Sequence, residues 1–232
     1  MDVLYPVGGR SPWGREELRY SIRSVCENIE HDRVIVSGEA PAWFTGTHVP
    51  GDTDAGKKVR NILGKILRGL EAAGPCVLVL CDDVLLLRSP DLRWGYKGRL
   101  SDAVASMRRR RSPNDGFLRS SVATLDLLRS KGIPEPMDFS THRPWLVERD
   151  AAIATVRYCL SLREPVDWQA VHWAAHGGEV ARLPQAKDKA WKGPPHAEDD
   201  VYSSGDAGER SEGFRAWCRG RWPEPCRWER PD

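Results

Sequence analysis

The feature that most constrains the fold is an apolar run from Pro75 to Cys81, followed directly by two acidic residues, Asp82 and Asp83. The run is continuously apolar rather than alternating, which is typical of a strand covered on both faces inside a mostly parallel sheet. In an open α/β sheet, ligands bind beyond the carboxyl ends of the strands. The sequence therefore predicts an α/β domain with two carboxylates at its ligand-binding edge.

The segments before this run alternate between strand and helix patterns. Strands are expected at residues 2–7 and 33–37, a short extended segment at 47–49, and helices at 14–29 and 57–73. In both helices apolar side chains recur on one face at helical spacing. This β-α-β order predicts a mostly parallel central sheet flanked by helices.

The second half of the chain is expected to be mainly helical. Helices are predicted at 100–111, 117–130 and 146–162, an extended segment at 137–141, and a loop of low order at 184–213. We expect one domain over residues 1–232, with three parts. These are a nucleotide- and metal-binding half at 1–100, a helical acceptor-side half at 101–183, and a flexible loop with a Trp- and Pro-rich C-terminal element at 184–232.

Composition narrows the functional classes. The 35 basic and 33 acidic residues give a formal charge of +2, a weak electrostatic case for a nucleic acid or a membrane as the main partner. The six cysteines show neither a Cys-x-x-Cys pair nor the Cys/His spacing of a zinc site, which favours buried reduced thiols. Because the sequence shows no secretion signal and no long apolar segment, we expect a cytoplasmic protein without a membrane partner.

Asp82 and Asp83 are the strongest candidates for chemistry. Neighbouring carboxylates at a strand end can hold Mg²⁺ or Mn²⁺ against the diphosphate of a nucleotide. Aspartates also end strands by bonding nearby backbone amides, so the residues alone leave both interpretations open. Gly8 and Gly9, after the first strand, resemble part of a phosphate-binding loop, although two glycines are a weak signal.

Other polar residues allow a functional and a structural interpretation. His142 has the pKa range of a general base and Arg143 the fork of a phosphate ligand, but both also fit an exposed loop. Lys58, Arg60 and Asn61 begin a helix, whose amides favour anions, or they form a solvated helix face. The histidines at 172 and 176 lack an evident third ligand, so no metal is expected there.

Several segments resemble the signature regions of the Stealth family, nucleotide-sugar transferases with a GT-A-like core that include sugar-1-phosphate transferases. The most specific is Glu-Leu-Arg-Tyr-Ser-Ile-Arg-Ser at 17–24, followed by Val-Ile-Val-Ser-Gly at 34–38 and Pro-Ala-Trp at 41–43. Cys-Asp-Asp-Val at 81–84 resembles the family's Asn-Asp-Asp-Val metal site, and the segment at 138–144 resembles its His-x-Pro region. Cys81 replaces the family's asparagine, and the acid of its first strand and a downstream arginine are missing.

The resemblance implies a GT-A-like, Rossmann-like single domain with a C-terminal helical and loop extension. It also implies a nucleotide-sugar donor, expected to be UDP-linked, and Mn²⁺ or Mg²⁺ held by Asp82 and Asp83. His142 would be the catalytic base, with Asp83 beside it and Arg143 steadying the donor phosphate. Further donor contacts are expected from Gly8, Gly9, Arg19, Lys58, Arg60, Asn61, Lys187 and Asp188.

Together these expectations describe a metal-dependent glycosyltransferase that moves a sugar to an acceptor hydroxyl. Compact versions of the pattern occur in phage genomes, which suggests a phage component such as a 5-hydroxymethylated DNA base as the acceptor and the cytoplasm of the infected host as the location. Three alternatives stay open: sugar-1-phosphate transfer, a non-catalytic sugar- or nucleic-acid-binding module of the same fold, and, ranked last, a metal nuclease built on the carboxylates.

Overall fold

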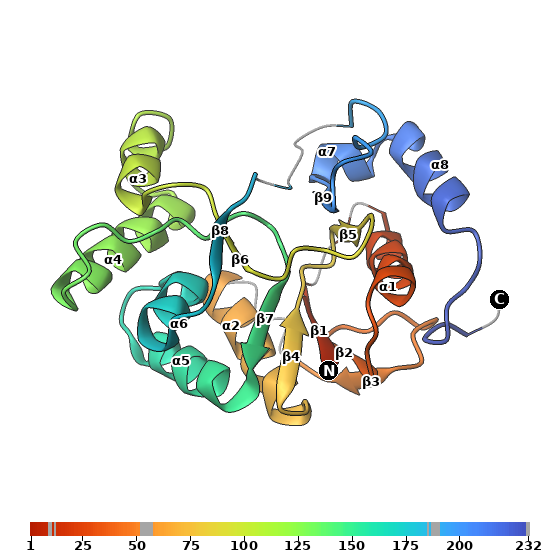
Figure 1. Ribbon diagram of the computed structural model, residues 1–232, viewed down its shortest axis with the longest axis horizontal. Helices are drawn as coiled ribbons and strands as arrows, with labels where there is room; N and C mark the ends of the chain where they lie inside the picture. Colours follow the sequence, from red (N-terminus) through yellow and green to blue (C-terminus); the bar gives the residue numbers. More distant parts are fainter. Residues whose placement is uncertain (9–10, 12, 52–57, 185, 187–190, 231–232) are drawn as a thin grey trace.

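A five-stranded sheet forms the centre of the computed structural model, which describes residues 1–8, 11, 13–51, 58–184, 186 and 191–230 (Figure 1). The strand order is β3-β2-β1-β4-β7. The strands are β1 (Asp2–Val7), β2 (Arg33–Gly38), β3 (Thr47–Val49), β4 (Cys76–Val79) and β7 (Trp145–Glu148). All neighbours pair in parallel except β4 and β7, which are antiparallel. The predicted α/β fold with a mostly parallel sheet is thereby confirmed.

Both faces of the central strands are buried, as the continuous apolar pattern predicts. Successive side chains of a strand point to opposite faces. Leu4 of β1 and Val77 of β4 accordingly join the apolar cluster beneath α2 (Lys58–Ala72), whereas Tyr5 and Leu78 join the cluster beneath α1 (Glu16–Asn28). The helices α1 and α2 therefore cover opposite faces of one sheet.

Two short sheets and six further helices complete the part of the molecule that the structure describes. β5 (Val84–Leu86) pairs with β9 (Val201–Ser203), and β6 (Trp94–Tyr96) pairs with β8 (Val180–Arg182). The remaining helices described are α3 (Leu100–Arg108), α4 (Gly116–Ser130), α5 (Arg149–Ser161), α6 (Trp168–His176), α7 (Asp206–Glu209) and α8 (Glu212–Arg221). Figure 1 shows α3 and α4 on one side of the sheet's upper edge and α7 and α8 on the other.

Three sequence-based expectations for the second half are wrong. The start of the helix predicted at 146–162 is strand β7, and Glu148 marks the change because its carboxylate accepts hydrogen bonds from the amides of Asp150 and Ala151 at the start of α5. The segment 137–141 forms a single bridge, from Met137 to Arg99, instead of a strand. The loop expected at 184–213 contains the buried strand β9 and the short helix α7.

The C-terminal segment packs against α1 and the loop after β2. Arg23 of α1 donates two hydrogen bonds of 2.6 Å to the carboxylate of Glu229. The amide of Thr45 bonds to the carbonyl of Trp228 at 2.9 Å, and the amide of Arg230 bonds to the carbonyl of Trp43 at 2.8 Å. The last described residues are thus tied to the N-terminal half.

The prediction of buried, reduced cysteines is confirmed in part. All six cysteines are free, but only Cys159 and Cys218 are fully buried, and Cys76 is exposed.

Within the described residues, every helix is too short or too polar to serve as a transmembrane segment.

His172 of α6 is a buried histidine of the helical half. Its ring stacks on Trp94 with 5.4 Å between centroids, and its Nδ1 lies 3.0 Å from the Thr155 hydroxyl. Burial, and next the charge of His176, lower the pKa of His172 to about 4. The imidazole is therefore neutral in the folded protein at neutral pH.

This burial predicts a loss of stability in acid. An unfolded histidine titrates near pH 6.5, so the contribution of neutral His172 is complete above that pH and is lost as the pH falls toward 4. We expect His172 to contribute about 2 to 3 kcal/mol to the fall in unfolding free energy between pH 7 and pH 4. Urea unfolding of His172→Gln should show a flatter pH dependence in this window. An unchanged slope would contradict the prediction, and the exposed His196→Gln is the matched control.

Candidate functional site

The two carboxylates lie in a tight turn at the carboxyl end of β4. The amide of Leu80 still bonds to β1, at the carbonyl of Leu4, over 3.0 Å, and the amide of Val84 then bonds to the carbonyl of Cys81 over 3.2 Å. This hydrogen bond closes a β-turn with Asp82 and Asp83 at its centre. Because β2 lies on one side of β1 and β4 on the other, the turn stands at the switch point of the sheet, where open α/β folds bind ligands.

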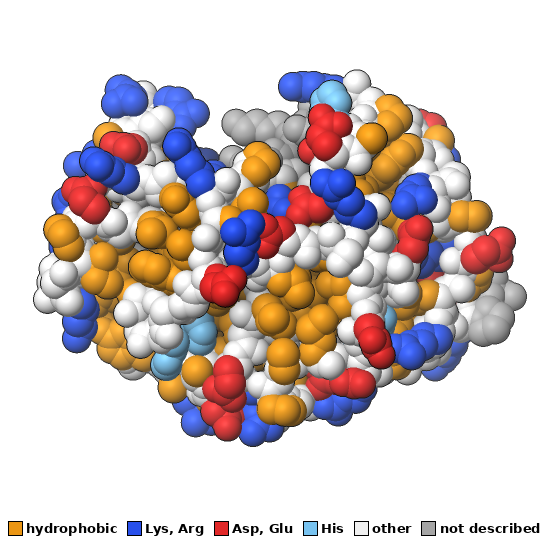
Figure 2. All heavy atoms as spheres, viewed as in Figure 1, with side chains coloured by type: hydrophobic (Ala, Val, Ile, Leu, Met, Phe, Trp, Pro, Cys, Tyr) orange, Lys and Arg blue, Asp and Glu red, His pale blue; other side chains and the backbone are white. Residues whose placement is uncertain are grey.

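The surface is hollowed at this edge of the molecule. In Figure 1 the arrow of β4 points to the upper edge of the sheet. Figure 2 shows a notch in that edge, between the part formed by α3 and α4 and the part formed by α7 and α8, with Lys and Arg side chains visible on both flanks. The notch lies on the side of the molecule to which β4 points.

Asp83 converges with two residues of other chemistry. Ligand atoms of Cys81, Asp83 and His142 all lie within 4.8 Å of one another, and the three side chains are half-buried. The Ser203 hydroxyl of β9 donates to the Asp83 carboxylate at 3.2 Å, and the amide of Ser204 bonds to the Asp83 carbonyl at 3.1 Å. His142 has a φ of 55°, a left-handed backbone conformation that few non-glycine residues adopt. The structure thus brings the predicted base next to one predicted metal ligand.

Asp82 faces a different set of groups. Burial raises its pKa to about 7, with further contributions from the charges of Asp83 and Glu209, while a backbone amide and Arg15 oppose the rise. A carboxyl group whose ionisation is opposed by neighbouring acids gains from a nearby cation. Burial and the neighbouring acids therefore favour the neutral form of Asp82, and a nearby cation would favour its ionised form.

Arg15 is a cation at this edge that no motif of the sequence predicts. It stands at the start of α1 with a φ of 71°. Its guanidinium donates to the carbonyl of Gly8 at 2.7 Å and forms an ion pair with Glu39, so it connects the ends of β1 and β2. Lys65 of α2 adds a buried ammonium that donates to the carbonyl of Val7 at 2.8 Å.

Three arginines expected at the donor have other partners. Arg143 is 4% exposed and forms an ion pair with Asp200. Arg60 donates to the carbonyls of Leu160 at 2.9 Å and Arg163 at 3.0 Å, closing the end of α5. Arg19 lies 3.5 Å from Glu229 and over the Trp43 ring. Each of these guanidinium groups has partners within the fold, and their donor contacts stay predictions.

The structure describes only some of the other residues predicted to contact the donor. Gly8 follows β1, and a Cβ built there would meet nothing within 4 Å, so the backbone is accessible to a ligand. Asn61 is half-buried in the first turn of α2, while the Lys58 side chain, Gly9, Lys187 and Asp188 lie outside the described residues. Ala186 is described: its amide bonds to Thr141 at 3.0 Å and its carbonyl accepts from Ser203 at 2.9 Å. Ala186 therefore connects Thr141, next to His142, with Ser203, which bonds to Asp83.

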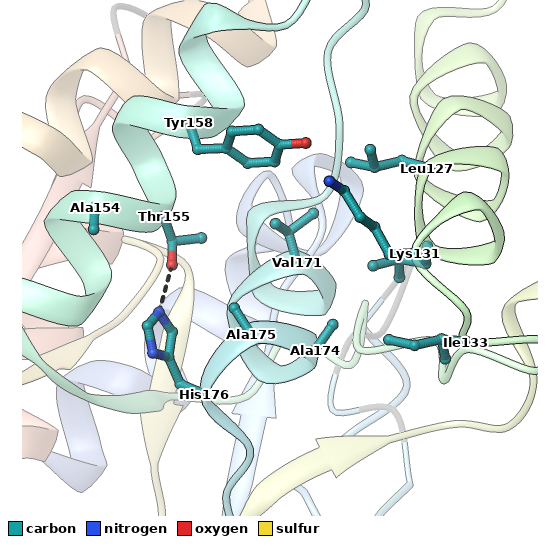
Figure 3. A pocket seen from close by; sticks show the side chains of 11 residues that line it. Leu127, Lys131, Ile133, Ala154, Thr155, Tyr158, Val171, Ala174, Ala175 and His176 are labelled. Atoms are coloured by element: carbon teal, nitrogen blue, oxygen red, sulfur yellow. Dashed lines mark hydrogen bonds between the residues drawn. The ribbon is translucent and has the colours of Figure 1, made fainter.

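An apolar pocket lies apart from the acidic turn, in the helical half. It has a volume of about 460 Å³ and lies between α4, α5 and α6 (Figure 3). Lys131, Tyr158 and His176 are the main polar groups of its lining, and His176 bonds to Thr155 at 3.3 Å. No carboxylate is among the described residues that line it. The residues predicted to be catalytic or metal-binding therefore lie at the carboxyl end of β4 and not in this pocket.

Comparisons with known proteins leave the family open. No family model matches the chain, and no curated protein matches it. Among solved structures, the chain is similar to 2-C-methyl-D-erythritol 4-phosphate cytidylyltransferase from Thermus thermophilus, with 16% sequence identity and a TM-score of 0.42, over 79% of this chain and 88% of that chain. A likeness this distant carries no information on the reaction, and the resemblance to the Stealth family stays a prediction from short motifs.

Proposed function

We propose that this protein is a metal-dependent glycosyltransferase that moves a sugar from a nucleotide-sugar donor, expected to be UDP-linked, to an acceptor hydroxyl. The observation that carries the proposal is the meeting of Asp83 and His142 beside Asp82 at the switch point of a parallel sheet. This is the edge at which α/β folds of this kind bind phosphorylated ligands. The motifs that resemble the Stealth family supply the donor class.

The acidic turn fits a divalent cation, Mn²⁺ or Mg²⁺ in the proposal. Burial, and next the charges of Asp83 and Glu209, raise the pKa of Asp82 to about 7, and a bound cation would favour the ionised carboxylate. Such an ion, when bound, neutralises charge on the leaving diphosphate. Asp82 and Asp83 would hold it, while Arg15, paired with Glu39, connects the ends of β1 and β2 beside them.

The remaining residues have narrower parts in the proposal. His142 would accept the proton of the acceptor hydroxyl, the role that the family resemblance implies. Further donor contacts are still expected from Gly8, Gly9, Lys58, Asn61, Lys187 and Asp188.

The acceptor to test first is a 5-hydroxymethylated DNA base. If the acceptor attacks the sugar carbon, UDP leaves; if it attacks the β-phosphorus, UMP leaves, and a phosphorus spectrum of one turnover separates these two reactions.

A thermal-shift screen of nucleotide sugars with and without Mn²⁺ tests the donor class. A ligand present at 100 times its Kd stabilises the native state by about 2.7 kcal/mol. For a domain of this size we expect the melting temperature to rise by roughly 5 to 10 °C. The rise should require both the nucleotide sugar and Mn²⁺.

The same screen distinguishes the alternatives. Stabilisation without any release of UDP or UMP over hours would favour the non-catalytic binding module. If no nucleotide sugar raises the melting temperature with Mn²⁺ or Mg²⁺, the proposed donor class is wrong. Nicking of a plasmid in the presence of Mn²⁺ would favour the nuclease.

A further inference from the structure

We propose that Cys81, Asp83 and His142 form a binding site for a divalent transition-metal ion of the zinc type, with a thiolate, a carboxylate and an imidazole as ligands. The three ligand atoms lie within 4.8 Å of one another. In a tetrahedral zinc site with bonds of about 2.0 to 2.3 Å, ligand atoms are roughly 3.3 to 3.8 Å apart. Small side-chain rotations therefore bring this set to bonding distance.

The local fold explains why these three side chains meet. Cys81 and Asp83 are the first and third residues of the β-turn after β4, and the Val84-to-Cys81 hydrogen bond of 3.2 Å fixes their separation. The intervening Asp82 is not among the residues whose ligand atoms converge. The turn therefore brings its first and third side chains together beside His142.

The supports of the ligands resemble those of metal sites. The Ser203 hydroxyl donates to Asp83 at 3.2 Å, which orients the carboxylate. Ala186 connects this support to the histidine loop, because it bonds to both Ser203 and Thr141, the residue before His142. Hydrogen-bonded neighbours that orient metal ligands typically change metal affinity by 10- to 100-fold when they are removed.

The ligand chemistry selects the ion. Thiolate and imidazole favour Zn²⁺ and Co²⁺, whereas Mg²⁺ and Ca²⁺ favour oxygen ligands. Three protein ligands leave a fourth position for water or substrate, as in catalytic zinc sites. The cysteine and histidine spacings did not predict this site, because its ligands come from segments far apart in the chain.

The metal site is inferred from the positions of its three ligands alone. Only a role of this site in sugar transfer rests on the proposed function. It also revises the part given to His142. A ring nitrogen that is bound to an ion cannot take the proton of an acceptor hydroxyl. In the zinc-loaded protein His142 is therefore a ligand.

Cobalt titration of the metal-free protein tests the proposal, because Co²⁺ replaces Zn²⁺ and reports thiolate ligation in its near-ultraviolet absorption. We expect saturation at one equivalent, a thiolate-to-cobalt band, and loss of the band when Zn²⁺ is added. Cys81→Ser should abolish the band and weaken Co²⁺ binding by at least about 100-fold, more than the usual loss from a supporting residue. Ser203→Ala should weaken binding by roughly 10-fold while keeping the band.

Two further variants keep the test decisive. His142→Asn suits the left-handed backbone and should also weaken binding by at least about 100-fold. Cys26→Ser is the matched control, because Cys26 is another thiol beside a histidine, 3.9 Å from His31; it should leave the titration unchanged. The proposal is overturned if saturable binding is absent, if the band survives Cys81→Ser, or if the band is lost in Cys26→Ser.

The metal site and the transferase proposal fail separately. Cobalt binding through Cys81 without any response to nucleotide sugars would support the metal site and count against the donor class. Donor binding that requires Mn²⁺, in a protein that shows no cobalt–thiolate band, would support the transferase and overturn the zinc-type site.

Discussion

Replacing Glu229 by alanine is expected to lower the free energy of unfolding by about 3 to 5 kcal/mol, the usual cost of breaking a buried ion pair. The Glu229 side chain is 2% exposed and that of its partner Arg23 is 9% exposed. Two hydrogen bonds of 2.6 Å join them in a bidentate arrangement. Without the carboxylate, a buried guanidinium would keep the Tyr20 ring and backbone carbonyls such as that of Trp222, at 2.8 Å, but no compensating charge at this distance among the described residues. Urea unfolding monitored by tryptophan fluorescence measures the loss.

Two comparisons interpret this loss. Glu212→Ala removes an exposed partner of Arg219 and should change the unfolding free energy by about 0.5 kcal/mol or less. The double variant Arg23→Met with Glu229→Leu should recover most of the stability, because a well-packed apolar pair can replace a buried ion pair. A loss below about 1 kcal/mol in Glu229→Ala would contradict the view that this pair holds the C-terminal segment on α1.

The first half of the fold is predictable because its signals are local. β1, β2 and β4 are apolar runs bounded by turn residues, and α1 and α2 have one continuous apolar face each. Such patterns depend on a few neighbouring residues. β7 has no such signal: its four residues join directly to α5, and only pairing with the edge of β4 makes them a strand.

Only the part of the candidate site that directly follows one strand can be predicted from the sequence. The position of Asp82 and Asp83 follows from the apolar run before them. The approach of His142 to Cys81 depends on the long path through α3 and α4, and the pairing of Arg143 with Asp200 depends on the segment before β9. Short-range patterns do not contain either contact. Motif resemblance singled out Asp83 and His142 and placed Cys81 where the family has asparagine. That Cys81 can share a ligand set with His142 is seen only in the folded structure.

Asp83→Asn is expected to reduce the rate of sugar transfer by about 1,000-fold, comparable to the loss of a principal electrostatic contact to a developing charge. The substitution keeps the size of the side chain and an oxygen that can still accept the Ser203 hydroxyl. It removes the charge that would hold a divalent ion against the donor diphosphate. Since Asp82 and Asp83 repel each other, the variant should fold at least as stably as the parent protein.

Transfer to the acceptor under saturating donor, together with the melting temperature, measures both effects. Asp126→Asn, at an exposed position of α4, is the matched control and should leave rate and stability unchanged. Full activity of Asp83→Asn would remove Asp83 from the reaction, whereas a fall in melting temperature would show that the carboxylate acts in folding instead. A stable and inactive variant is the expected combination, because a carboxylate that holds a metal ion for the reaction serves function at the expense of stability.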